Sequence, residues 1–172
     1  ARICEHIVAH YNEGWADGFH YDIEYWEIWN EPDDGLRISQ MWNGTAEDYY
    51  RLYDVTAKHL KARFPNIKVG GYAAIGFYYV IDTPEEREKD PRKKYYMDFF
   101  YGFMEYIKAN GSPLDFFSWH CYCEPKQLIE EGKWVREQLE KYGYGDIESH
   151  LNEWNPPCRT TRDISSQHGA EI

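Results

Sequence analysis

The sequence has no run of eighteen consecutive apolar residues, and no basic segment followed by an apolar one. A membrane-spanning helix needs about 20 such residues, and a secretory leader needs an apolar segment behind a basic one. We therefore expect no membrane partner. The chain opens with Ala1 rather than Met, in the middle of a helical pattern, which indicates a lost upstream segment. The sequence therefore does not indicate the cellular compartment of the protein.

Basic residues are scarce relative to acidic ones. Lys and Arg total 19 against 30 Asp and Glu, which gives a formal net charge of −11. Proteins that bind nucleic acid draw most of their affinity from positive charge facing the phosphates. The charge balance therefore argues against nucleic acid or another polyanion as a partner.

Cysteine is too rare to act as a disulfide scaffold, with four residues in a chain of 172. Cys121 and Cys123 are two residues apart, and on an extended strand that spacing would strain a direct disulfide. Together with His120 they could ligate a metal, but no second pair at zinc-site spacing follows. We expect the cysteines to be incidental, with no metal site and no organic cofactor.

Aromatic residues are in excess, at 18% of the chain with 7 Trp and 16 Tyr. Such rings stack on the C–H faces of sugars, and they also fill cores and amphipathic interfaces. Composition alone does not separate these two roles. Only the position of each ring can show whether it stacks on a sugar or fills the core.

Apolar periodicity predicts helices that alternate with strands. The expected helices cover residues 2–13, 45–65, 95–110 and 127–142, and the expected strands cover residues 23–29, 67–74, 114–123 and 147–154. Residues 82–94 are charged and contain two prolines, so we expect an exposed loop there. We predict one domain over residues 1–155 and a polar tail over residues 156–172.

Strands that alternate with helices form parallel β-α-β units, which build either a barrel or a doubly wound sheet. Both fit the alternation equally well, but no glycine-rich phosphate loop opens any of the helices, which disfavours nucleotide binding. A complete (β/α)8 barrel needs roughly 250 residues. The chain is therefore too short for a complete barrel.

Two glutamates stand at informative positions. Glu31 follows the first strand and Glu153 ends the last, and each comes directly after an asparagine, Asn30 or Asn152. The carboxyl ends of parallel barrel strands meet on one face, where active sites are built. Glycoside hydrolysis requires two carboxyl groups on either side of one bond. The placement of the two glutamates fits that chemistry.

Several segments resemble glycoside hydrolases of clan A. WNEP at residues 29–32 resembles the signature that ends the fourth barrel strand, and LNEWN at 151–155 resembles the nucleophile segment of the seventh. MWNGT at 41–45, LYDVTAKHLKARFP at 52–65, KVGG at 68–71 and DFFSWHCY at 115–122 resemble family 39, which includes β-xylosidases and α-L-iduronidases. Two features depart from the family pattern: Tyr72 replaces a usual proline, and cysteines flank Tyr122.

The resemblance implies an α/β fold of the parallel (β/α)8 TIM-barrel type, incomplete, with about strands four to seven and their helices. It implies a retaining glycoside hydrolase of β-xylosidase-like type, with Glu31 as acid/base and Glu153 as nucleophile. Its carbohydrate substrate would contact Asn30, His120, Tyr122 and Trp154.

A barrel segment of this kind leaves strand edges and apolar faces uncovered. We therefore expect a homo-oligomer that covers the open edges. The alternative function is a catalytically inactive fragment that binds carbohydrate or only self-associates, or a structural protein. The sequence leaves the sugar, the linkage and the activity of the chain open.

Overall fold

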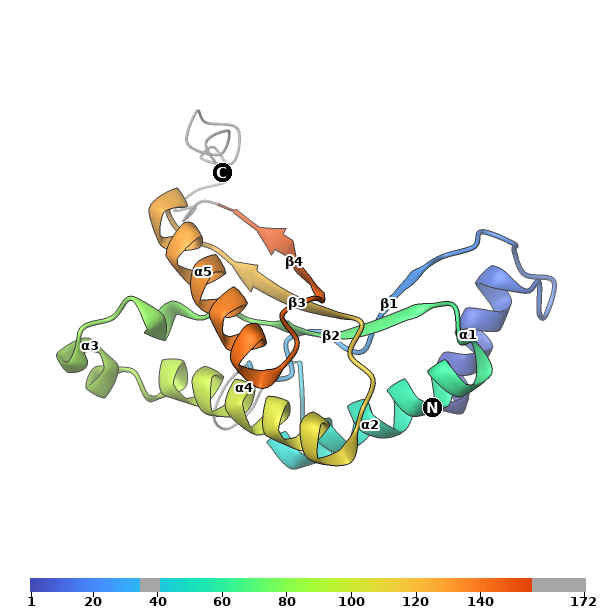
Figure 1. Ribbon diagram of the computed structural model, residues 1–172, viewed down its shortest axis with the longest axis horizontal. Coiled ribbons are helices and arrows are strands. Elements are labelled where there is room, and N and C mark those ends of the chain that lie inside the picture. The colour runs from blue at the N-terminus through green and yellow to red at the C-terminus, as the bar shows by residue number, and fades with distance from the viewer. Residues whose placement is uncertain (35–40, 156–172) are drawn as a thin grey trace.

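The computed structural model describes residues 1–34 and 41–155. The predicted tail over residues 156–172 lies outside them. The described residues form helices and strands that alternate along the chain, and Figure 1 shows their arrangement. In chain order these are α1 (Arg2–Asn12), β1 (Tyr25–Glu27), α2 (Ala46–Arg63), β2 (Lys68–Ala74), the 3-10 helix η1 (Tyr78–Val80), α3 (Pro84–Lys89), α4 (Pro91–Asn110), β3 (Phe116–Cys121), α5 (Pro125–Tyr142) and β4 (Glu148–Trp154).

The four strands form one parallel sheet in the order β1-β2-β3-β4. The sheet is curled, and α2, α4 and α5 cover one side of it in Figure 1. The predicted α/β fold, a partial barrel of four strands with their helices, is confirmed. None of the helices within residues 1–34 and 41–155 is long and apolar enough to cross a membrane.

Local signals in the sequence fix the helix ends. Thr45 caps α2: its hydroxyl accepts from the backbone of Asp48, whose carboxylate accepts from the backbone of Thr45, which forms a capping box. Gly111 and Gly143 follow α4 and α5 in the left-handed conformation, with φ of 60° and 90°. Glycine takes this conformation without a steric penalty, so both helices end there.

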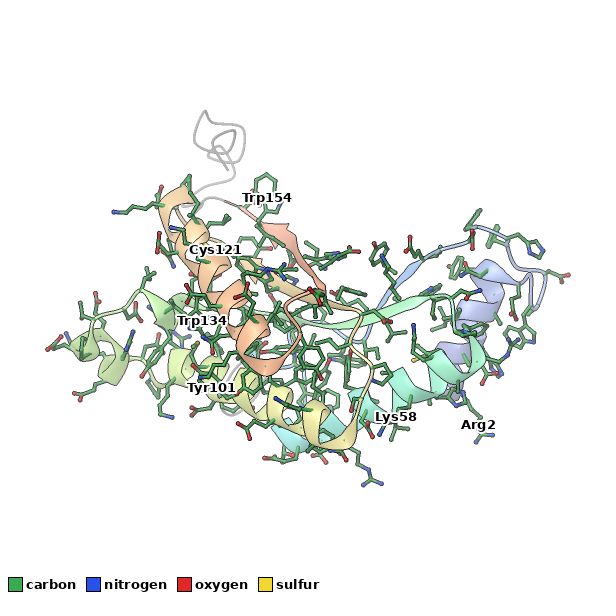
Figure 2. The ribbon with its side chains drawn as sticks, in the orientation of Figure 1. Arg2, Lys58, Tyr101, Cys121, Trp134 and Trp154 are labelled. Carbon is green, nitrogen blue, oxygen red and sulfur yellow. A yellow bond between two sulfur atoms is a disulfide. The ribbon has the colours of Figure 1, made fainter. Side chains whose placement is uncertain are left out.

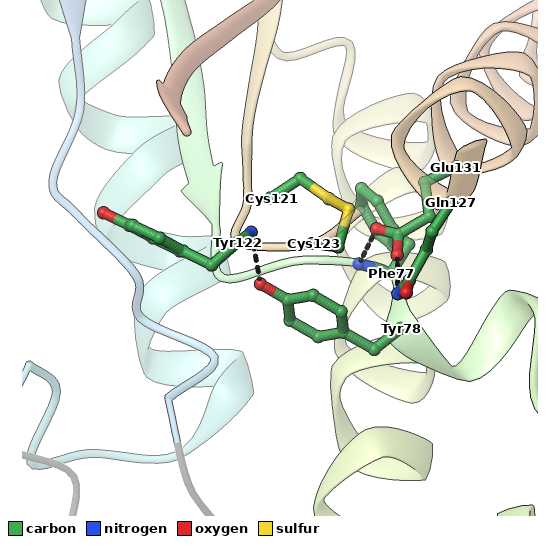
Figure 3. Close-up of a disulfide and its surroundings, with 7 residues drawn as sticks. All are labelled: Phe77, Tyr78, Cys121, Tyr122, Cys123, Gln127 and Glu131. Carbon is green, nitrogen blue, oxygen red and sulfur yellow. Dashed lines mark hydrogen bonds between the residues drawn. A yellow bond between two sulfur atoms is a disulfide. The ribbon is translucent and has the colours of Figure 1, made fainter. Parts of the chain in front are cut away.

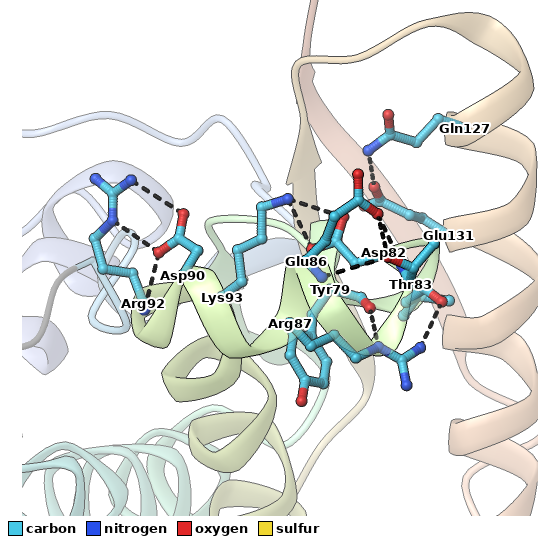
Figure 4. Close-up of polar contacts among 11 residues, drawn as sticks. Tyr79, Asp82, Thr83, Glu86, Arg87, Asp90, Arg92, Lys93, Gln127 and Glu131 are labelled. Atoms are coloured by element: carbon cyan, nitrogen blue, oxygen red, sulfur yellow. Dashed lines mark hydrogen bonds and ion pairs between the residues drawn. The ribbon is translucent and has the colours of Figure 1, made fainter.

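The expected exposed loop over residues 82–94 is wrong, because this stretch is largely helical. Thr83 forms a second capping box with Glu86 at the start of α3, and Asp90 caps α4 (Figure 4). The two prolines that suggested a loop occupy first-turn positions, where a missing N–H costs nothing. Capping residues and N-terminal prolines therefore outweigh the missing apolar periodicity here.

The hydrophobic core lies between the sheet and α2, α4 and α5, and it is largely aromatic. Its fully buried rings pack edge to face and at tilted angles, and they include Tyr49, Tyr53, Tyr72, Phe77, Phe99, Phe100, Phe103 and Phe117. Such packing adds to the stabilisation from buried apolar area. Much of the aromatic excess is thus structural.

Two irregularities interrupt the sheet near the carboxyl ends of its strands. Between β2 and β3 the register shifts after Gly71, so that β2 takes three steps to Ala74 while β3 takes two. Between β3 and β4 it shifts again, and β4 advances from Leu151 to Glu153 while β3 advances by one residue. Bulges of this kind redirect side chains, and they are common next to active sites.

The expectation that Cys121 and Cys123 are not paired is wrong, because the structure joins them by a disulfide (Figure 3). Their Cα atoms are 5.8 Å apart, within the usual range for a disulfide. The argument from an extended strand fails because β3 ends at Cys121 and the chain bends before α5 begins at Pro125.

Candidate active site

Three side chains that are far apart in the sequence meet where the strands end. His120 belongs to β3 and is almost completely buried, Glu153 belongs to β4, and Glu31 follows β1. Nδ1 of His120 lies 2.8 Å from Oε1 of Glu31 and 2.8 Å from Oε2 of Glu153. One nitrogen and two carboxylate oxygens thus lie within 4.8 Å of one another.

The bulge in β2 holds Glu31. The backbone N–H of Glu31 donates to the carbonyl of Ala73 at 3.0 Å, and the N–H of Ala73 donates to Oγ of Ser118 at 2.9 Å. Glu31 adopts φ of 45° and Ala73 φ of 55°, a left-handed conformation that costs a residue with a side chain roughly 1 kcal/mol. These hydrogen bonds offset that cost and fix the direction of the Glu31 side chain.

Asp33 supports the same loop from inside the protein. Its fully buried carboxylate accepts from the backbone N–H of Ile75 at 3.1 and 3.3 Å. Burial raises the pKa of Asp33 well above its usual range, and the charge of Glu31 acts in the same direction. The hydrogen bond from Ile75 partly opposes both. Asp33 thus ties the loop after β1 to the end of β2.

Tyr122 follows β3 and reaches the same cluster. The pKa of its phenol is raised first by burial and then by the nearby negative charge of Glu153. Its backbone N–H donates to Oη of Tyr78 at 2.9 Å, and burial raises the pKa of Tyr78 to about 12. Both phenols therefore stay neutral near pH 7, and Tyr122 can act as a hydrogen-bond donor.

Below the cluster, polar side chains line the concave face of the sheet. Nζ of Lys68 lies 2.8 Å from Glu148 and 2.7 Å from the hydroxyl of Tyr25, which itself lies 3.0 Å from the same carboxylate. Hydrogen bonds from Lys68, His150 and Tyr25 lower the pKa of Glu148 to about 2. Tyr25 and Glu148 belong to the first and last strands, so these contacts cross the curled sheet.

The two remaining predicted residues are at the rim. Asn30 is exposed and precedes Glu31 in the loop after β1. Trp154, labelled in Figure 2, ends β4. The residue is 44% exposed. In an extended strand successive side chains point to opposite faces, so Trp154 leaves β4 on the face opposite to Glu153. The structure brings Glu31, His120, Tyr122 and Glu153 together and leaves these two outside.

The sequence interpretation missed supporting residues, of which Glu131 is the clearest. It is fully buried, it accepts from the backbone of Phe77 at 3.0 Å and from Gln127 at 2.8 Å, and burial raises its pKa to about 7. Its position was informative, because Glu131 falls between Leu128 and Val135 at the i+3, i+4 spacing of the apolar face of α5. For Asp33 and Tyr78 we find no comparable signal in the sequence.

The spacing of Glu31, His120 and Glu153 would also allow them to ligate a metal ion. Carboxylate oxygen and imidazole nitrogen are common ligands of divalent metals. Two carboxylates and one imidazole can equally share protons without a metal. The set can therefore perform acid, base and nucleophilic chemistry by itself.

Comparison with known proteins shows which family model and which proteins the chain matches. The model of the family Glycosyl hydrolases family 39 matches residues 3–152. A beta-xylosidase from Geobacillus stearothermophilus is 23% identical over 87% of the chain, and one from Caldicellulosiruptor saccharolyticus is 28% identical over 70%. The crystal structure of a glucosidase from Croceicoccus marinus superposes on 93% of the chain with a TM-score of 0.74 and 30% identity.

The matches cover most of this chain but a minor part of each relative. The chain spans 29% and 19% of the two beta-xylosidases and 31% of the glucosidase. A fourth protein, N2152 from Neocallimastix frontalis, shares the fold with a TM-score of 0.50 at 19% identity, over 76% of this chain and 27% of its own.

Proposed function

Because the chain belongs to glycosyl hydrolases family 39, we propose that it carries the two catalytic carboxylates of a retaining glycoside hydrolase. One observation supports this most directly: an oxygen of Glu31 and an oxygen of Glu153 lie within 4.8 Å of each other. Retaining enzymes place their carboxyl groups about 5 to 5.5 Å apart, and inverting enzymes need about 6.5 to 9.5 Å to admit water. The short separation favours the retaining mechanism.

In the first step Glu153 attacks the anomeric carbon while Glu31 gives a proton to the glycosidic oxygen, and the leaving group departs as an alcohol. The product is a glycosyl-enzyme ester on Glu153. In the second step Glu31 takes a proton from water, which attacks the same carbon and releases the sugar. Two inversions return the anomeric configuration of the substrate.

The neighbouring side chains would position these groups. In the tautomer that places the hydrogen of a neutral imidazole on Nδ1, His120 can donate fully to only one carboxylate at a time. The phenol of Tyr122 lies close enough to feel the charge of Glu153, so it would favour the ionised form of the nucleophile. Asn30 would contact a sugar hydroxyl, and the exposed ring of Trp154 would contact the substrate only at the rim.

We propose a β-xyloside as the substrate, with a β-glucoside as the second choice. Two relatives are described as beta-xylosidases and one solved structure as a glucosidase. The two sugars share ring and configuration and differ by one exocyclic group. A panel of aryl glycosides can therefore rank them directly.

The decisive experiment measures aryl β-xyloside and β-glucoside hydrolysis by the chain and by Glu31→Ala and Glu153→Ala, with Glu130→Ala as control. Glu130 is an exposed acid on α5, remote from the cluster. Turnover should be lost in Glu153→Ala and reduced in Glu31→Ala. Added azide should give an α-glycosyl azide with Glu153→Ala, by one inversion, and a β-glycosyl azide with Glu31→Ala, by two.

The anomeric configuration of the azide product thus assigns each role separately. The opposite assignment of products would reverse the roles of Glu31 and Glu153. Hydrolysis with inversion by the unmodified chain would reject the retaining mechanism.

A second candidate function is a catalytically inactive barrel segment that binds carbohydrate or only self-associates. An apolar groove of about 450 Å³ between α1, β1 and α2 favours it, with Ile3 77% and Ile7 45% exposed beside Trp29. We propose that a second copy of the chain covers this groove and the open strand edge. No turnover on any glycoside, together with a dimer in solution, would support this function over the first.

A further inference from the structure

The disulfide between Cys121 and Cys123 encloses Tyr122, the residue whose phenol interacts with the charge of Glu153. We propose that this disulfide is a thiol-exchange site, open to small thiols, that fixes Tyr122 and whose reduction lowers turnover. The last part rests on the proposed function, whereas the exchange site itself does not.

Access to the disulfide is one-sided. Cys121 is fully buried and Cys123 is 4% exposed, and of the two only Cys123 lines an open cavity of about 300 Å³, together with Tyr78, Lys93 and Gln127. A thiol that enters the cavity therefore reaches Cys123 before Cys121. Exchange proceeds by attack of a thiolate on one sulfur while the other leaves. The geometry makes Cys123 the attacked sulfur and Cys121 the leaving group.

A buried acid stands ready to protonate the leaving sulfur. A carboxylate oxygen of Glu131 lies within 4.8 Å of both sulfur atoms. Figure 3 shows Glu131 above Phe77, next to the disulfide. Because burial raises the pKa of Glu131 to about 7, a large fraction of this carboxyl is protonated near neutral pH.

A dithiol supplies the two electrons that reduction of the Cys121–Cys123 disulfide requires. The first thiolate forms a bond to Sγ of Cys123, the Cys121–Cys123 bond breaks, and Cys121 takes a proton from Glu131. The second thiol of the reagent then displaces Cys123 from the mixed disulfide. The dithiol is oxidised by two electrons, both cysteines become thiols, and solvent returns the proton to Glu131.

The consequence for the active site follows from how Tyr122 is held. Its backbone donates to Tyr78 at 2.9 Å, its phenol lies in the field of Glu153, and the disulfide closes the chain on both sides of it. Tyr122 itself is 42% exposed, so packing restrains it weakly. Opening the disulfide removes the covalent restraint, so the hydrogen bond to Tyr78 breaks more often and the phenol moves away from Glu153 more often.

The test follows the chain, purified without reductant, before and after treatment with dithiothreitol, by alkylation with peptide mapping and by hydrogen exchange. We expect Cys121 and Cys123 to resist alkylation until reduction, and the Tyr122 amide to lose protection once they react. Glu131→Gln should slow the reduction, whereas Glu130→Gln, its exposed neighbour on α5, should not. Turnover should fall on reduction, and a Cys121→Ser, Cys123→Ser variant should no longer respond.

Free thiols at both positions in the air-exposed protein would overturn the proposal. Unchanged exchange at Tyr122 after complete reduction would overturn it too, as would one tightly held zinc ion per reduced chain, which would indicate a metal site. If no glycoside is hydrolysed in either redox state, the proposed function fails, while alkylation and hydrogen exchange still test the exchange site.

Discussion

Asn152 donates a hydrogen bond of 2.9 Å from Nδ2 to Oε1 of Glu27, although β4 and β1 are the two outermost strands of the sheet. The contact is possible because the sheet curls and because the bulge in β4 turns two consecutive residues, Asn152 and Glu153, to the concave face. One of them reaches the first strand and the other reaches His120. The bulge in β4 thus contributes both to the curl of the sheet and to the candidate active site.

A double-mutant cycle can measure this contact. We expect Glu27→Ala and Asn152→Ala to couple by about 0.5 to 1 kcal/mol in urea unfolding, because both side chains are exposed and water competes for the bond. A coupling energy of zero would mean that the contact does not help to hold the curl.

Removal of the His120 imidazole should distinguish a role in positioning the carboxylates from a role in binding the substrate. We expect His120→Ala to lower kcat on aryl xylosides on the order of 100-fold with little change in KM, because the two carboxylates lose their common partner. His150→Ala serves as control, since His150 contacts Glu148 deeper on the concave face. An equal loss in both variants would indicate a general structural effect.

Tyr72 offers a stabilising substitution. Its hydroxyl is buried and has no hydrogen-bond partner among the residues that the structure describes. We expect Tyr72→Phe to raise the free energy of unfolding by about 1 kcal/mol, because it removes an uncompensated polar group. Tyr49→Phe is the matched control: Tyr49 donates to the carbonyl of Ile28 at 2.7 Å, so its loss should cost about 1 to 2 kcal/mol. Denaturant unfolding measures the free energy of unfolding of both variants. A decrease for Tyr72→Phe or an increase for Tyr49→Phe would contradict these expectations.

Glu131 should make stability depend on pH in the direction opposite to a salt-bridged acid. Its pKa rises from 4.5 to about 7 on folding, so between these values the folded protein keeps a proton that the unfolded chain releases. Stability relative to Glu131→Gln should therefore fall as pH rises from 4.5 to 7, by on the order of 3 kcal/mol, and stay constant above.

Thermal or urea unfolding of both proteins across this range measures the difference. Glu130→Gln, at an exposed neighbouring position, should run parallel to the unmodified chain. A flat difference between the unmodified chain and Glu131→Gln would mean that Glu131 titrates normally.

Self-association should depend on the groove between α1, β1 and α2. We expect Ile7→Glu to shift the chain to monomer in light scattering at micromolar concentration, because it places a charge on the apolar surface that a second copy would cover. Val55→Glu alters an equally exposed apolar residue outside the groove and should leave association unchanged. A monomer at all concentrations in the unmodified chain would refute the oligomer.

Most elements could be predicted from local patterns, and the errors have physical causes. The four predicted helices and four predicted strands all exist, with ends displaced by a few residues, because periodicity and caps act over short distances. Residues 82–94 are helical without apolar periodicity, because capping residues and first-turn prolines start both helices there. Asp33 could not be predicted as a support, because burial of its carboxylate depends on what folds over it.

The sequence by itself determined the helix caps, the alternation of strands and helices, and the two glutamates beside their strand ends. All of these depend on residues that are close in the chain. Only the tertiary structure decided that His120 contacts both Glu31 and Glu153 and that Cys121 and Cys123 pair. Those relationships depend on sheet curl, on bulges and on a chain bend, and such features arise when distant segments pack together.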